Sequence, residues 1–186
     1  MCIDILRNPV KSLAIAKKSK NMNKTMLALV ESSVLFALAA GILVARTSLL
    51  TELLLMSTVA VFLVMLIGSL LMGLVVHISA STLTSRGKYF DGLTSVVYGM
   101  LPISLGFFLT SLVSFIPFSI GLQIIILAIT LAVGISTVYR GIKELYSTDM
   151  VTSFIVVSVA ILVIFVAVYA SAGITILNRV AAMGVI

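Results

Sequence analysis

The chain alternates between long apolar runs and short polar stretches, and the length of the runs predicts membrane-spanning helices. Five runs match the roughly 20 apolar residues that a helix needs to cross a bilayer. They cover residues 26–45, 53–76, 93–114, 119–138 and 151–172. The pattern therefore predicts an all-α polytopic membrane protein, in which a bundle of five transmembrane helices forms a single domain over residues 1–186.

The third and fourth runs are assigned as two helices because of the length of the apolar stretch, since no charged residue divides them. No charged residue lies between Asp91 and Arg140, a stretch more than twice as long as one helix needs to cross. Residues 115–119 are the turn-forming interruption near its middle, and Pro117 suits the first turn of the next helix, where its missing N–H is not needed. We expect two antiparallel helices joined at this turn.

The first 24 residues are polar and basic, and they precede the first apolar run. Asn8 and Pro9 offer an N-cap and a first helical residue, and Val10, Leu13 and Ala14 follow at helical spacing. This pattern predicts a short amphipathic interfacial helix, held by apolar burial and by anionic lipid headgroups. A disordered basic tail is the alternative.

Composition and charge support this interpretation and orient the chain. The sequence is 61% hydrophobic and 10% charged, with a mean hydropathy of +1.31, which is too apolar for a water-soluble globule. Ten of the 12 Lys and Arg residues lie in three blocks, at residues 7–24, 86–88 and 140–143. Because short cytoplasmic loops retain basic residues, we expect the N-terminus and both basic loops in the cytoplasm and the C-terminus outside.

Several classes of function find no support in the sequence. The net charge of +6 is spread over separate stretches without interleaved aromatic residues or a recognition motif, so a nucleic-acid partner is not expected. Cys2 is the single cysteine, which excludes a disulfide or a thiolate metal cluster within one chain. There is no phosphate-binding loop, nucleophile elbow or pair of histidine ligands. We therefore expect no enzyme activity, no cofactor and no metal.

Glu31 is the main candidate for intramembrane chemistry, because a carboxylate inside a span is costly and often functional. The first predicted helix starts in the cytoplasm and the second ends there, so Glu31 and His77 lie at matching depth, followed by Arg86 and Lys88. We expect Glu31 to face the bundle and to meet one of these groups. The alternative is a carboxylate that reaches the interface or holds helices together.

Small residues recur at four-residue spacing in four of the runs and predict faces where helices pack closely. These faces are Ser33, Ala37, Gly41 and Ala45; Ser69, Gly73, His77 and Ser81; Gly106, Thr110 and Ser114; and Ala128, Ala132 and Ser136.

The third run contains a predicted kink at Tyr98, Gly99 and Pro102. Pro102 cannot donate a hydrogen bond to the carbonyl of Tyr98, four residues earlier, so the helix should bend there. The freed carbonyl would need a neighbouring helix or water. Such a bend creates either a small polar cavity or a purely structural kink.

Taken together, several short segments resemble the Yip family, whose name stands for Ypt-interacting protein. They are Leu6-Arg7-Asn8-Pro9 before a basic helix, Tyr98-Gly99-Met100-Leu101-Pro102 in the third of five spans, and Gly141-Ile142-Lys143-Glu144-Leu145-Tyr146 before the fifth. The resemblance implies a five-span helical protein with a cytoplasmic N-terminus and a C-terminus on the opposite side. Arg140, Lys143 and Glu144 would then belong to a cytoplasmic loop.

Eukaryotic proteins of this kind resemble one another in binding Rab-type GTPases and sister Yip or Yif proteins during vesicle traffic. This chain lacks their long cytosolic N-terminal region and their Asp-Leu-Tyr-Gly-Pro motif, and so resembles the compact prokaryotic members, which lie in the cell membrane. This difference argues against GTPase binding. Our leading hypothesis is a non-enzymatic membrane scaffold or adaptor that engages lipids, a protein partner or a second copy. The alternative is a small-solute or proton-coupled carrier that uses Glu31.

Overall fold

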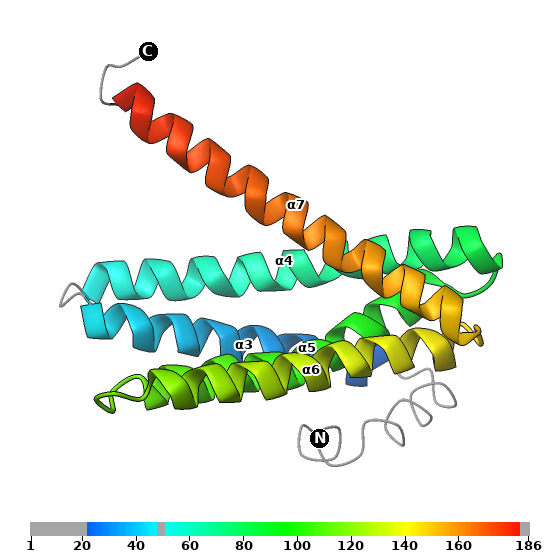
Figure 1. Cartoon of the computed structure of the whole chain (residues 1–186), viewed down its shortest axis with the longest axis horizontal. Helices are drawn as coiled ribbons and strands as arrows, with labels where there is room; N and C mark the ends of the chain where they lie inside the picture. The colour runs from blue at the N-terminus through cyan, green and yellow to red at the C-terminus, as the bar shows by residue number, and fades with distance from the viewer. Residues whose placement is uncertain (1–21, 48–50, 183–186) are drawn as a thin grey trace.

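A computed structural model of the chain describes residues 22–47 and 51–182, which form long helices (Figure 1). The helices are α3 (Met22–Thr47), α4 (Thr51–Thr84), α5 (Tyr89–Val113), α6 (Ile120–Leu145) and α7 (Met150–Ala182). All five are long and apolar enough to cross a membrane. The predicted all-α membrane fold is therefore confirmed, whereas the predicted N-terminal interfacial helix lies outside the described residues.

α5 is the central helix of the bundle, because it packs against α3, α4 and α6. Leu93, Val97, Tyr98 and Leu101 are buried on it and pack with residues of α3. Half of the most apolar stretch of α5 is buried, compared with 11% of that of α6. α5 therefore supplies most of the protein-facing surface, while α6 presents most of its surface to its surroundings.

Glycine and other small residues bring α5 and α6 into close contact. A Cβ atom added to Gly134 would lie 2.7 Å from the carbonyl oxygen of Gly99, and one added to Gly141 would lie 3.0 Å from the Cα of Ser95. Thr130 fills the space beside Gly106 in the same way. The backbones can approach only because these positions carry no side chain.

The predicted packing faces are largely buried in three helices, and the prediction is wrong in the fourth. The buried members are Ser33, Ala37, Gly41, Ser69, Gly73, Gly106 and Ser114. On α6, however, Ala128, Ala132 and Ser136 are exposed, and the helix packs through Gly134, Thr137 and Gly141 instead. Both sides of α6 carry small residues at helical spacing, so the spacing alone could not identify the side that meets α5.

The turn between α5 and α6 occupies residues 114–119, at the predicted interruption. The hydroxyl of Ser119 donates to the carbonyl of Val113 over 2.9 Å and accepts from the side chain of Gln123 over 2.8 Å. α6 begins at Ile120, so Pro117 lies in the turn itself and not in the first helical turn, where the sequence placed it. Its fixed φ suits either position.

α5 continues as one helix through Pro102, whose side chain is buried. Tyr98 and Gly99 are buried as well, so this segment of α5 faces the protein interior. A bend of the helix at this segment stays a prediction.

α7 packs chiefly on α4 and α6. Val156, Val157 and Ala160 of α7 form a buried cluster that includes Val76 of α4 and Ile142 of α6. Beyond this cluster α7 diverges from the other helices (Figure 1), and each residue from 162 to 169 is exposed. The first part of α7 is thus anchored to the bundle, whereas the part that follows stands apart from it.

Candidate functional site

Two loops meet at one end of the bundle, and Tyr146 lies between them. The loop before α5 (residues 85–88) and the loop before α7 (residues 146–149) both lie there (Figure 1). Tyr146 is the C-cap residue of α6 and is only 1% exposed. A buried tyrosine needs a partner for its hydroxyl, and α4 and the loop before α5 supply the partners.

The hydroxyl of Tyr146 joins α4 to the loop before α5. Its oxygen lies 3.2 Å from Nδ1 of His77, and it donates to the carbonyl of Lys88 over 3.3 Å. A phenol has one proton to donate. When the hydroxyl donates its hydrogen to the Lys88 carbonyl, it can only accept in the bond with His77. Nδ1 of His77 therefore carries a hydrogen in that arrangement.

Burial raises the pKa of the Tyr146 hydroxyl far above its ordinary value, and the negative charge of Asp91 raises this pKa further. The group therefore keeps its proton at neutral pH and is a constant hydrogen-bond donor. This chemistry suits a fixed connection between helices rather than proton transfer.

Two glycines make room for the Tyr146 side chain. Gly87 has a φ of 88°, which other residues rarely adopt, and a Cβ atom there would overlap the ring. A Cβ at Gly92 would lie 2.6 Å from the carbonyl oxygen of Gly73 and 3.0 Å from the Tyr146 hydroxyl. Either glycine would therefore resist replacement without a shift of the loop or of α4.

Neighbouring groups hold the start of α5 beside this site. A carboxylate oxygen of Asp91 accepts from the backbone N–H of Lys88 over 2.8 Å, which closes the first turn of the helix. The rings of His77 and Tyr89 meet edge to face with centroids 6.4 Å apart. The hydroxyl of Tyr89 in turn donates to the carbonyl of Leu70 over 3.0 Å.

The basic residues predicted for the loops gather at this end of the bundle, which we call the basic end, defined by Arg86, Lys88, Arg140 and Lys143. Arg86, Lys88 and Arg140 are exposed, and Lys143 is half-buried. Glu144, which follows Lys143 on α6, is exposed too.

Glu31 lies within the membrane-spanning part of α3 and is half-buried. The ring of His77 contacts Tyr146 and Tyr89. The expected pairing of Glu31 with His77, Arg86 or Lys88 stays a prediction.

Tyr146 is the central residue that the sequence alone did not single out. It appeared only as the last residue of the Gly141–Tyr146 segment, without a role. A tyrosine between an apolar helix and a polar loop is common in membrane proteins, and nothing local reveals that His77 and Lys88, 69 and 58 positions away, bind it.

The described part of the chain contains no group of three or more His, Cys, Asp or Glu side chains that could hold a metal ion. Comparison with protein-family models matches residues 3–172 to the Yip1 domain. No curated protein and no solved structure matches the chain. The match spans α3 to α6 completely, with α7 as far as residue 172.

Proposed function

The chain belongs to the Yip1 domain family and is a multi-pass integral membrane protein, and we propose that it acts as a non-enzymatic scaffold or adaptor. In this proposal the bundle presents surfaces to another membrane protein and to anionic lipids, and the basic end faces the cytoplasm. The observation that carries the proposal is the segment of α7 formed by residues 162–169.

This segment, which we call the outer part of α7, is exposed along its whole length. Phe165 and Tyr169 are 71% and 84% exposed. Helices in a bilayer associate through side-chain packing and hydrogen bonds rather than through hydrophobic burial, so a helix that extends away from its own bundle can pack on a foreign helix at little cost to the fold. Tyr169 adds a hydroxyl for such a contact.

Site-specific crosslinking tests the scaffold role. A photo-reactive residue at Phe165 is expected to link the protein to one discrete partner in native membranes. The same residue at Val64 of α4, which is 65% exposed, is the matched control and should give no discrete product. Equal, diffuse labelling from both positions would argue against a docking role for the outer part of α7.

The second candidate function is a small-solute or proton-coupled carrier. It is favoured by Glu31, an ionisable residue inside a membrane span, because such residues often lie on transport pathways. In proteoliposomes, a carrier would show substrate or proton flux that Glu31→Gln abolishes. Glu52→Gln, at the exposed start of α4, would leave that flux unchanged. Flux that depends on Glu31 and not on Glu52 would overturn the scaffold proposal.

A further inference from the structure

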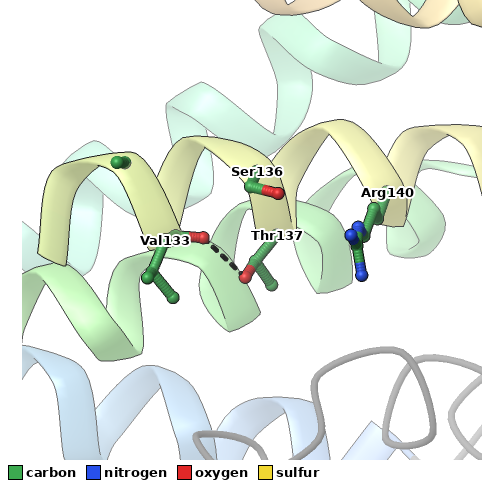
Figure 2. Close-up of a pocket in the computed structure, with 5 residues that line it drawn as sticks. Val133, Ser136, Thr137 and Arg140 are labelled. Atoms are coloured by element: carbon green, nitrogen blue, oxygen red, sulfur yellow. Dashed lines mark hydrogen bonds between the residues drawn. The ribbon is translucent and has the colours of Figure 1, made fainter. Parts of the chain in front are cut away.

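A groove runs along α6 toward the basic end, between the exposed face of the helix and the buried face that carries Thr137. Its volume is about 360 Å³, and it is lined by Ala132, Val133, Ser136, Thr137 and Arg140. Figure 2 shows Val133, Ser136, Thr137 and Arg140 on successive turns of the helix, with the Arg140 guanidinium at one end. The groove therefore changes along its length from apolar to hydroxyl-bearing to cationic.

Arg140 lies near the end of α6, and its long side chain can carry the guanidinium to the lipid headgroups. α6 has 26 residues and is about 39 Å long, somewhat longer than the roughly 30 Å hydrocarbon core. Arg140 lies about 7 Å before the last residue of the helix, and Ala132 lies about 12 Å deeper. The apolar end thus lies at the depth of acyl chains.

We propose that this groove binds one anionic phospholipid, with its phosphate on Arg140 and part of one acyl chain along Ala132 and Val133. A guanidinium forms two parallel hydrogen bonds to a phosphate, and it does so more strongly where water is scarce. Ser136 offers a hydroxyl between the two regions. The hydroxyl of Thr137 already donates to the carbonyl of Val133 over 2.8 Å and does not take part.

Charge complementarity favours an anionic lipid over residues 1–21 as the occupant of the groove. Arg140 is exposed at the cationic end of the groove. Residues 1–21 carry one acid, Asp4, and five basic residues, which are Arg7, Lys11, Lys17, Lys18 and Lys20. That segment would be repelled by Arg140 and attracted by the phosphate that we place there.

The inference rests on the membrane location of the protein and not on the protein partner of the proposed scaffold. Its test therefore has a separate readout, which is lipid retained by the full-length chain. Failure of the crosslinking experiment at Phe165 would leave this test unaffected, and failure of this test would leave the crosslinking result unaffected.

Native mass spectrometry of the full-length protein in detergent provides the test, with phosphatidylglycerol and phosphatidylcholine of identical acyl chains offered in equal amounts. Wild-type protein is expected to retain one phosphatidylglycerol in preference to phosphatidylcholine. Arg140→Gln should weaken that binding about tenfold, because a charge-assisted contact is lost. Lys143→Gln removes a charge from the same end but outside the groove, and should leave binding within about twofold of wild type.

A second pair of variants tests the apolar part of the groove without any change of charge. Ala132→Phe should obstruct the groove and weaken phosphatidylglycerol binding, whereas Ala128→Phe, one turn deeper on the same face and outside the lining, should not. Equal thermal unfolding of both variants in detergent shows that the bundle is intact.

Three results would overturn the proposal. Equal losses in Arg140→Gln and Lys143→Gln would indicate diffuse attraction to a basic surface. Equal retention of both lipids by the wild type would remove the anionic preference. Absence of lipid from the wild-type chain would show that the groove does not hold a phospholipid.

Discussion

Among individual residues, Tyr146 is the group that joins the two loops at the basic end. Its ring is buried against Gly87, and its hydroxyl bonds with His77 of α4 and the carbonyl of Lys88. The contacts come from segments that are far apart in sequence. Removal of these contacts should therefore lower the free energy of unfolding and leave the helix content unchanged.

Removal of the Tyr146 hydroxyl tests this role. We expect Tyr146→Phe to lower the free energy of unfolding by about 1 kcal/mol, because the bonds to His77 and Lys88 are lost while the ring remains. Tyr146→Ala should cost roughly 3–5 kcal/mol, because it also leaves a cavity. Thermal unfolding in detergent measures both. Tyr169→Phe, at an exposed site, is the control, and identical behaviour of Tyr146→Phe and wild type would contradict the prediction.

Alkaline pH provides an independent test of the same group. Burial raises the pKa of Tyr146, so the folded state holds its proton more tightly than the unfolded state. The stabilisation is complete below the ordinary tyrosine pKa of about 10 and is lost as the pH rises above it. As the pH rises above about 10, wild-type protein should therefore lose more stability in detergent unfolding than Tyr146→Phe, which has no proton to lose at this position. Parallel curves would argue against this account.

Asp149 should respond to pH in the opposite direction, because its stabilising contribution is lost at low pH. Its carboxylate accepts from the backbone N–H groups of Val151 and Thr152 at the start of α7, and hydrogen bonds from Thr152 lower its pKa. This contribution is present above the ordinary Asp pKa of about 4 and is lost as the pH falls below it. Hydrogen-exchange protection at the first turn of α7, measured relative to the intrinsic exchange rate at each pH, should fall at low pH in the wild type. In Asp149→Asn, an uncharged cap, it should not respond to this titration.

Among the helices, the contact between α5 and α6 depends on the face of α6 that carries Gly134 and Gly141. The outward face carries Ala128, Ala132 and Ser136 and is exposed. One side of α6 packs on α5, and the groove that ends at Arg140 lies between the two faces, because Thr137 of the packing face lines it together with Ala132 and Ser136 of the outward face.

Substitution of glycine by alanine distinguishes the two faces. Gly134→Ala places a Cβ against Ile103 and 2.7 Å from the carbonyl oxygen of Gly99, so we expect α5 and α6 to separate slightly at a cost of about 1–3 kcal/mol. Gly121→Ala, also on α6, meets nothing within 4 Å and should be neutral or slightly stabilising. Unfolding in detergent measures the difference, and equal effects at the two positions would contradict the packing described for α6.

The bundle as a whole has a basic end and a far end, where α5 turns into α6. Arg86, Lys88, Arg140 and Lys143 belong to the first, while residues 114–119 at the far end carry no charge. The asymmetry predicts that the basic end lies in the cytoplasm.

Cysteine accessibility tests this orientation in intact cells, in a background where Cys2 is replaced by serine. Ser85→Cys and Ser147→Cys, in the two loops of the basic end, should react with a membrane-impermeant reagent only after the cells are opened. Phe118→Cys, in the turn at the far end, should react from outside. Labelling of Ser85→Cys or Ser147→Cys in intact cells would reverse the assigned orientation.

The number of spans and the all-α fold could be predicted from the sequence, because whether a segment crosses a bilayer depends on its own length and composition. The family was predicted separately, from the resemblance of short segments such as Gly141–Tyr146. Five apolar runs sufficed to predict α3 to α7. The loop lengths also brought the predicted basic residues of the second and third blocks to one end, since antiparallel helices return the chain to the same side.

The faces through which the helices meet could not be predicted from the sequence, because they depend on residues of the neighbouring helices. In α6 two faces had suitable spacing, and the choice depended on Ser95, Gly99 and Gly106 of α5, which lie far away in the sequence. The pairing of His77 with Tyr146 arose in the same way, from the relative rotation of α4 and α6. Lipid solvates apolar side chains as well as the protein interior does, so hydropathy marks a span but carries no information about which of its faces is buried.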